Sequence, residues 1–266
     1  MKIKHGGRDA TRRLTIESYE GERATLVGRL YLPRASRYVT IAQMNLNGRN
    51  RSSLPSPTVN SEDAEFTGDD VTNEHTGICF ILGSSGYGRA RRTVINANRV
   101  HDCGKEPSHN QDHGIYVAES DGARITNNVI FKNADRGIQL FPDAQNTVIQ
   151  HNVIDGNGEG ITFSGDGTSS NNTLVEFNLI TNAKIRYDVE SYYPDGTPRG
   201  VNNVVRNNCI FAGAQGAIGE ESGYTARVGN KAVNPQYASV AAGNYAVPSA
   251  NRCAIYIAGG TPLAPF

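Results

Sequence analysis

The sequence lacks long apolar runs and a net charge. No stretch of its 266 residues approaches the ~18 consecutive apolar residues of a membrane span, so we expect no membrane insertion. The 26 lysines and arginines balance the 26 aspartates and glutamates. A neutral chain has no overall field to attract nucleic acid or an anionic membrane. Nucleic acid is therefore not an expected partner, and any site for a polyanion must be local.

The N-terminus lacks the apolar centre of a signal peptide. Residues 1–7, MKIKHGG, are charged, polar or glycine apart from two apolar positions. A cytosolic protein and a secreted protein with a trimmed signal peptide would both begin in this way. We expect the second, a secreted or cell-surface protein. An amphipathic capping helix is also absent from this end, and a lost N-terminal cap would account for that.

A repeat of about 23 residues is the most prominent feature that is present. Units of the form Gly-Ile-polar-apolar begin at Gly114, Gly137 and Gly160, each 23 residues after the last. Each unit alternates apolar and polar positions over three to five residues and then meets Gly, Asn or Asp, which is typical of short strands. A second column places an asparagine before apolar residues in five repeats, at Asn98, Asn128, Asn152, Asn178 and Asn208.

This repeat predicts an all-β fold, a single-stranded right-handed parallel β-helix with polar loop insertions. One coil cannot bury its own apolar positions, but coils stacked at ~4.8 Å align like residues into ladders. We expect Ile115, Ile138 and Ile161 to share one inner column, and the asparagine column to satisfy the backbone of the turns. The handedness follows from the rule for parallel crossovers.

Departures from the repeat indicate where the chain leaves the cylinder. We assign residues 1–266 to one domain, with coils over about 14–213 and a C-terminal capping segment, 214–266, that folds back to cover the last coil. Three polar segments are predicted to be loops, which often carry function on rigid scaffolds: 51–74, 104–112 and 192–200.

The four cysteines lack the CxxC spacing of zinc or redox sites. Their even number permits two disulfides in three connectivities, with buried free thiols as the alternative. We predict that Cys79 pairs with Cys103 and Cys209 with Cys253. The first two cysteines lie 24 residues apart and hence about one coil apart.

These columns resemble the parallel β-helix repeat of pectate-lyase-like proteins, alginate lyases, mannuronan epimerases and periplasmic proteins of the NosD type, over roughly residues 14–250. Residues 112–117, 136–143 and 186–191 resemble, more narrowly, uncharacterised secreted β-helix proteins of actinobacteria. The resemblance implies long acidic polysaccharides lying across the strand faces. The sequence departs from those families because it has no clear Asp-Pro-His epimerase motif and no obvious pectate-lyase arrangement of calcium-binding aspartates. The activity therefore does not carry over directly.

Stacking brings residues that are one coil apart to within about 5 Å, so a candidate site can be predicted from the register. One column precedes the repeat glycine and contains Thr76, His113, Arg136 and Glu159. The outward strand column contains Cys79, Tyr116, Gln139, Thr162 and, with Tyr187 aligned to the inner isoleucines, Asp188. We therefore expect His113, Tyr116, Arg136 and Gln139 to converge.

These four residues supply the groups that β-elimination on a uronate requires. Arg136, assisted by Gln139, would neutralise the carboxylate, His113 would remove the C5 proton, and Tyr116 would protonate the leaving oxygen. We expect the loop around His109 and the segment 51–74 to wall the site. The candidate substrate-binding residues are His109, Lys132, Asp143, Lys184, Arg186, Asp188 and Glu190.

Structural roles and metal sites are the alternatives for these residues. His113 could be a turn histidine, Tyr116 a packing residue, and Arg136 one half of an ion pair with Glu159. A transition metal could bind where histidines and a carboxylate cluster, at His75, His109, Asp112 and His113. No cofactor is certain, and calcium is a candidate only at the acidic stretch 62–70.

The leading functional hypothesis is a polysaccharide lyase, or a C5 epimerase, acting on an acidic polysaccharide as its partner. The alternative is a noncatalytic glycan-binding or cell-surface β-helix, which the neutral charge favours. A glycoside hydrolase would need paired carboxylates, and Glu159, Asp166 and Glu190 form no obvious pair in the sequence.

Overall fold

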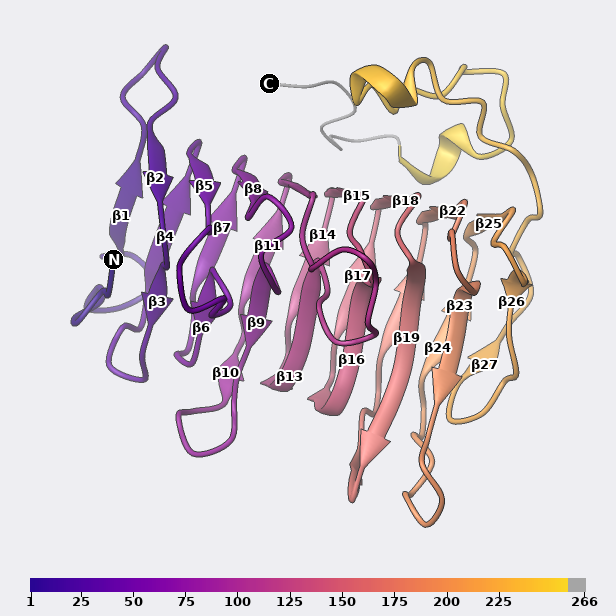
Figure 1. Cartoon of the computed structure of the whole chain (residues 1–266), viewed down its shortest axis with the longest axis horizontal. Helices are drawn as coiled ribbons and strands as arrows, with labels where there is room; N and C mark the ends of the chain where they lie inside the picture. The colour runs from indigo at the N-terminus through magenta and orange to yellow at the C-terminus, as the bar shows by residue number, and fades with distance from the viewer. Residues whose placement is uncertain (258–266) are drawn as a thin grey trace.

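Each coil of the chain contains three short strands in a fixed order and contributes one strand to each of three parallel sheets. The computed structural model describes residues 1–257 and shows an elongated stack of coils (Figure 1). We name the sheets after their first strands. The predicted parallel β-helix is confirmed.

Sheet 1 has nine strands and sheet 2 has eight. Sheet 1 consists of β1 (Leu14–Glu17), β4 (Val39–Ala42), β7 (Glu65–Thr67), β11 (Val94–Asn96), β14 (Arg124–Thr126), β17 (Val148–Gln150), β21 (Leu174–Glu176), β24 (Val204–Arg206) and β27 (Thr225–Ala226). Sheet 2 consists of β2 (Thr25–Val27), β5 (Asn45–Asn47), β8 (Asp70–Thr72), β12 (Arg99–His101), β15 (Val129–Phe131), β18 (Val153–Asp155), β22 (Leu179–Thr181) and β25 (Cys209–Phe211).

Sheet 3 contains the longest strands and carries the candidate site. Its main path consists of β3 (Tyr31–Leu32), β6 (Thr58–Val59), β9 (Phe80–Leu82), β13 (Ile115–Asp121), β16 (Arg136–Gln145), β19 (Glu159–Asp166), β23 (Tyr187–Tyr192) and β26 (Gly216–Ile218). Two short strands join it at the side, β10 (Ala90–Arg91) beside β13 and β20 (Thr168–Ser169) beside β19.

The inner column of sheet 3 is confirmed. Ile115 pairs with Ile138 and Ile138 with Ile161, and all three are fully buried. The close stacking also explains the repeat glycine, because a Cβ at Gly160 would lie 2.0 Å from the carbonyl oxygen of Asp188.

The expected register is wrong by two residues at both ends of this column. Ile115 pairs with Phe80 rather than Ile78, and Ile161 pairs with Val189 rather than Tyr187. A slip of two residues keeps every side chain on its own face of the strand, so alternation alone cannot detect it. The outward column of sheet 3 therefore contains Ile81, Tyr116, Gln139, Thr162 and Glu190.

The asparagine column forms a buried ladder at the corner between sheets 1 and 2. The Oδ1 atom of each asparagine from Asn128 to Asn208 accepts the backbone N–H of the asparagine one coil earlier, over 2.9 Å at each step. The residue before each ladder asparagine has a positive φ between 53° and 58°, which turns the chain sharply. Coils measured along this ladder are 24 to 30 residues long, so the interval of 23 residues does not hold for every coil.

We expect Asn152→Ala to lower the free energy of unfolding by about 2–3 kcal/mol. In the native protein, Oδ1 of Asn152 accepts hydrogen bonds from the backbone N–H and from Nδ2 of Asn128, each over 2.9 Å. The substitution removes this acceptor, and buried unpaired donors lower the free energy of unfolding. Urea unfolding measures the change. Asn96→Ala is the matched control on the outer face of sheet 1, where the expected loss is below about 1 kcal/mol. Equal losses of unfolding free energy in the two variants would show that the buried ladder stabilises the protein no more than an outer-face hydrogen bond does.

The segment 51–74 is not a loop, and the prediction that it leaves the cylinder is wrong. It contains β6, β7 and β8, with Val59, Phe66 and Val71 fully buried in the core. Four of its acids pair with arginines on nearby coils, which explains why the segment looks polar in sequence: Glu62, Asp63, Glu65 and Glu74. Glu62 pairs with Arg37 at 2.9 Å, for example.

The first part of the C-terminal segment continues the coil as β26 and β27, and residues 233–257 lie along the outer face of sheet 2, whereas we expected the segment over the last coil. Tyr245, Cys253 and Tyr256 pack in one buried cluster with residues of sheet 2 from Val129 to Cys209. The segment contains two short 3-10 helices, η1 (Val240–Ala242) and η2 (Ala254–Tyr256), and crosses several coils in Figure 1. The last nine residues of the predicted capping segment, 258–266, lie outside the described residues.

Both predicted disulfides are present. Cys79 and Cys103 have Cα atoms 5.7 Å apart and link neighbouring coils. Cys209 and Cys253, with Cα atoms 5.8 Å apart, tie the C-terminal segment to β25. Within residues 1–257, no helix is both long and apolar enough to cross a membrane.

Candidate functional site

Two neighbouring hollows lie on the outer face of sheet 3. The first, of about 340 Å³, is lined by the four predicted catalytic residues His113, Tyr116, Arg136 and Gln139, together with Asn110, Gln111, Phe141, Ser164 and Tyr192. The second, of about 370 Å³, is lined by Ser108, His109, Asn110, Arg136, Glu159, Ile185, Arg186, Glu190 and Tyr192. Because Asn110, Arg136 and Tyr192 line both, the hollows form one continuous groove, which we call the central groove.

Arg136 is the cation between the two hollows. Its Nε atom lies 2.8 Å from Oε2 of Glu159, one coil further along, and also donates to Thr162 over 3.2 Å. Its Nη1 atom donates to the carbonyl oxygen of Asn110 over 3.3 Å. No residue from 1 to 257 accepts a hydrogen bond from Nη2, so this end of the guanidinium retains donors for a ligand.

Two carboxyl groups lie next to each other in the second hollow. Arg186 donates to Glu190 through Nε and Nη2, over 3.0 and 2.6 Å. Burial raises the pKa of Glu159 to about 7; Arg136 opposes this rise, and a hydrogen bond to Glu190 adds to it.

His113 and Tyr116 lie on the other side of Arg136. Their rings meet edge to face, with centroids 5.3 Å apart. Burial lowers the pKa of His113 to about 3, and the charge of Arg136 acts in the same direction. Burial also raises the pKa of Tyr116 to about 12. At neutral pH the site therefore presents an uncharged imidazole and a protonated phenol.

Asp135, which we did not predict from the sequence, holds the loop that walls the groove. Its carboxylate accepts backbone N–H groups of Asn110, Gln111 and Asp112 over 3.0, 2.7 and 2.6 Å, and the hydroxyl of Ser108. Asp135 lies 23 residues after Asp112, so the repeat length contained a signal for this contact.

Three predicted ligand residues lie on the groove and four do not. His109, Arg186 and Glu190 line the second hollow. Asp188 is wrong as a ligand residue, because it is fully buried and its carboxylate accepts the backbone N–H groups of Ala183 and Gly213, each over 2.9 Å. The other three predicted residues are absent from both linings: Lys132, Asp143 and Lys184.

The aromatic walls of the groove were also missed. Phe141 stacks on Tyr116, with centroids 6.3 Å apart, and Tyr192 is 62% exposed at the end of β23. The segment 51–74, expected as a wall, contributes nothing to either lining. Tyr192 begins a different predicted polar segment, 192–200, and supplies that wall instead.

The histidines proposed as metal ligands do not come together. His109 lies 3.3 Å from Asp112, whereas the ring of His75 contacts the carbonyl of Gly104 and lies 3.5 Å from Asp102. Within residues 1–257, no group of three or more His, Cys, Asp or Glu residues is arranged to hold a metal ion. This includes the acidic stretch proposed for calcium.

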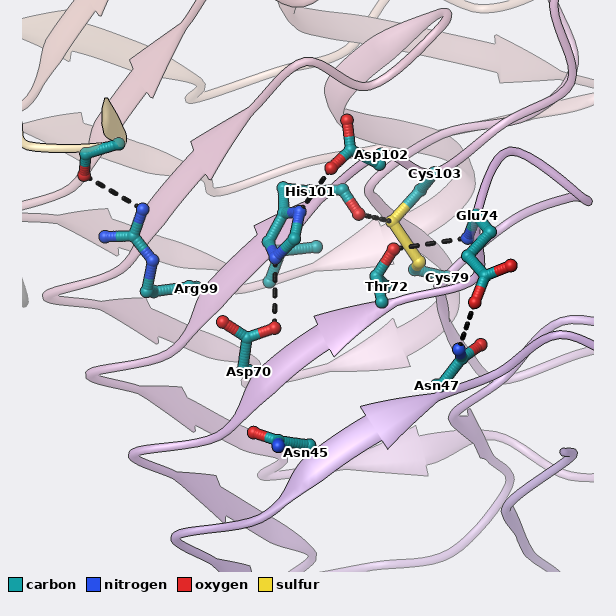
Figure 2. A network of polar contacts seen from close by, with 12 residues as sticks. Asn45, Asn47, Asp70, Thr72, Glu74, Cys79, Arg99, His101, Asp102 and Cys103 are labelled. Atoms are coloured by element: carbon teal, nitrogen blue, oxygen red, sulfur yellow. Dashed lines mark hydrogen bonds and ion pairs between the residues drawn. A yellow bond between two sulfur atoms is a disulfide. The ribbon is translucent and has the colours of Figure 1, made fainter. Parts of the chain in front are cut away.

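A separate polar network on sheet 2 involves an acid from that stretch (Figure 2). His101 lies between two carboxylates, with Nδ1 2.6 Å from Asp102 and Nε2 3.0 Å from Asp70. Burial alone would lower the pKa of His101, but the two carboxylates raise it to about 9. The protonated ring stacks on Phe131, with centroids 4.8 Å apart.

We expect the protein to lose stability between about pH 6.5 and pH 9, and His101→Gln to remove part of this loss. The pKa of His101 is higher in the folded protein than its value of about 6.5 in the unfolded chain, so its protonation stabilises the fold fully below about pH 6.5. This contribution disappears as pH rises through the folded-state pKa of about 9. The contribution is at most about 3 kcal/mol. Urea unfolding at pH 6 and pH 9.5 measures it. Phe131→Leu removes the stacked ring but keeps both carboxylates, so this variant should lower stability and retain most of the pH dependence. An unchanged pH dependence in His101→Gln would contradict this account.

The comparisons with known proteins identify the family. The family described as "Right handed beta helix region" matches residues 56–193, more than half of the chain. A search of the curated proteins finds no match. Among solved structures, the A-module of the Azotobacter vinelandii mannuronan C-5 epimerase AlgE4 is similar, with a TM-score of 0.52 and 15% identity over 82% of this chain and 56% of that chain.

Two further solved structures are more distant. XylC in complex with xylose has a TM-score of 0.46 and 12% identity, covering 77% of this chain and 39% of that chain. The Dettilon tailspike protein has a TM-score of 0.40 and 14% identity, covering 85% and 55%. This chain spans just over half of the epimerase module, and the likeness to that module is one of fold. From the family match and the three-sheet coil we conclude that the chain belongs to the right-handed β-helix family.

Proposed function

We propose that the protein binds an acidic, uronate-containing polysaccharide in the central groove and cleaves it by β-elimination, with C5 epimerisation as the closest alternative reaction. One observation carries the proposal. A cation, an amide, a neutral imidazole and a protonated phenol line the same hollow, at Arg136, Gln139, His113 and Tyr116. These are the groups that both reactions use.

In the proposed reaction, Arg136 and Gln139 bind the uronate carboxylate, which acidifies the C5–H bond. His113 accepts the C5 proton, and the electron pair of that bond forms the C4–C5 double bond. The C4–O bond breaks, and the leaving oxygen takes the proton of Tyr116. In epimerisation, the C4–O bond stays intact, His113 keeps the proton it has removed, and Tyr116 instead donates a proton to the opposite face of C5.

Substrate binding would also tune the base. The charge of Arg136 contributes to the low pKa of His113. A carboxylate that pairs with Arg136 offsets this charge, so the basicity of His113 rises when a substrate is bound.

The groove has further features that suit a sugar chain. Tyr116, Phe141 and Tyr192 offer rings on which the apolar face of a pyranose can stack, and polar groups stand between them. The mannuronan C-5 epimerase module, which has a similar fold, supports a uronate as the substrate class. Two disulfides support a secreted or cell-surface location, since such bonds persist in oxidising compartments.

The Arg136–Glu159 ion pair favours the second candidate function, noncatalytic glycan binding, because it partly neutralises the cation that a lyase needs. The raised pKa of Glu159 lessens this conflict, since a protonated Glu159 leaves the charge of Arg136 available to a substrate.

Affinity for an oligouronate is therefore expected to fall as pH rises through about 7, the pKa of Glu159, because ionised Glu159 competes for Arg136. Titration calorimetry at pH 5.5 and pH 8.5 measures the change. In Glu159→Gln the decrease between the two pH values should disappear. A decrease that persists in this variant would show that another group titrates.

A panel of alginates, pectins and glycosaminoglycans tests the proposed function. A lyase produces absorbance from unsaturated products, an epimerase exchanges the C5 proton with deuterium from the solvent without cleavage, and a binder only releases or takes up heat in calorimetry. Cleavage or exchange supports the proposal, binding alone supports the second candidate, and no response to any polyuronate overturns both uronate functions.

A further inference from the structure

A second aromatic hollow lies on the same face of sheet 3, over the three coils that precede the coil of Tyr116. It has a volume of about 390 Å³, and Arg29, Tyr31, Leu54, Ile81 and Tyr87 contribute to its lining. Tyr87 is 68% exposed and Leu54 43% exposed, so apolar surface is open to solvent here. We call it the distal hollow.

The distal hollow and the central groove share one column of outward side chains. Tyr31 pairs with Thr58, Thr58 with Ile81, and Ile81 with Tyr116. Ile81 lines the distal hollow and Tyr116 lines the central groove, so the two hollows have lining residues on neighbouring strands, β9 and β13. Three strand spacings from Tyr31 to Tyr116 amount to about 14 Å.

This spacing suits a polysaccharide that runs along the helix axis. A pyranose unit extends a chain by roughly 5 Å, about the spacing of neighbouring strands. If one sugar of such a polysaccharide lies at Tyr116, the sugar three units further along therefore lies at Tyr31.

The charge at the distal hollow suits an anion better than the charge at Arg136 does. The guanidinium of Arg29 lies 4.8 Å from the ring centroid of Tyr31, and Nζ of Lys2 lies 5.6 Å from it. Within the described part of the chain, no acidic residue lines this hollow. In the central groove, by contrast, Glu159 partly neutralises Arg136. Nε of Arg29 is buried and has no hydrogen-bond acceptor, although Nη2 donates to Thr58 over 3.3 Å.

We propose that the distal hollow is a second subsite of the same polysaccharide, in which Tyr87 stacks on a sugar ring and Arg29, held against the ring of Tyr31, binds its carboxylate. This inference rests on the proposed function of the central groove. It adds a substrate length and a direction: the chain lies along the helix axis, across the strands, and both subsites fill only when the oligosaccharide is long enough to span about four sugars.

The test measures affinity as a function of oligouronate length, with titration calorimetry on oligomers of two to eight sugars. Wild-type affinity should rise steeply once the oligomer reaches both hollows. Tyr31→Ala and Tyr87→Ala should each lower the affinity for the longest oligomers about tenfold and leave the affinity for the disaccharide unchanged. Arg29→Gln should have the same selective effect, reduced further in high salt.

Two control variants lie away from this face. Tyr19→Ala removes a tyrosine that is 79% exposed beyond β1, and Arg124→Gln removes an exposed arginine from sheet 1. Neither should alter the dependence on length. Because Tyr87 is on an exposed turn, its variant tests the subsite without disturbing the core.

The outcomes separate this inference from the proposed function. Two results would overturn the distal subsite and leave the central groove intact. In the first, the disaccharide binds and Arg136→Ala abolishes this binding, but longer oligomers bind no more tightly. In the second, longer oligomers bind more tightly, and all three distal variants retain this gain in affinity. Failure of every oligouronate to bind would overturn the proposed function and this inference with it.

Discussion

Arg136→Ala is expected to lower turnover of the cleaved or epimerised polyuronate by about 100-fold or more. Losing one positioned electrostatic group typically costs this much, and Arg136 is the cation that lines both hollows of the central groove. Initial rates of unsaturated-product formation, or of C5 proton exchange, measure the loss. The Arg136→Lys variant keeps the charge but loses the planar guanidinium, so we expect it to recover only part of the activity.

The chain offers a closely matched control for this experiment. Arg206 pairs with Glu176 on sheet 1 through the same two atoms, Nε and Oε2, at 2.7 Å. Arg206→Ala also leaves a buried glutamate without its cation, but away from the groove, so turnover should stay normal. Adding Glu159→Gln to Arg136→Ala removes the uncompensated carboxyl and keeps the fold testable. Normal turnover and normal glycan binding in both Arg136→Ala and His113→Ala would eliminate this site.

Replacing both Cys209 and Cys253 by alanine is expected to lower the free energy of unfolding by about 4 kcal/mol. The bridge closes a loop with a sequence separation of 44 residues, and chain entropy predicts a loss of about this size. Denaturant unfolding measures it. Alanine is preferred because both positions are fully buried in an apolar cluster, where a serine hydroxyl would need a partner.

This double variant should keep its activity below its unfolding transition. The C-terminal segment packs on sheet 2, whereas the central groove is on sheet 3. A loss of less than about 1 kcal/mol would mean that the packing of Tyr245 and Tyr256 holds the segment without help from the disulfide. Lost activity with an intact fold would contradict the separation of the two faces.

Much of the candidate site was predictable because two successive coils have the same length. His113, Arg136 and Glu159 follow one another at intervals of 23 residues, and the structure pairs Arg136 directly with Glu159. Where a coil is longer, the expectation failed. The interval from Ile161 to its partner Val189 is 28 residues, and there Glu190 takes the outward place that we had given to Asp188.

The sequence by itself determined the coil, its inner isoleucine column and the asparagine ladder. In a solenoid each of these residues contacts its own equivalent one coil away, so a regular interval in the sequence is also a contact in space. Only the tertiary structure decided the register beside irregular coils, the position of Tyr192 and the path of the C-terminal segment. These depend on side-chain contacts between segments without a common repeat, and no interval in the sequence encodes them.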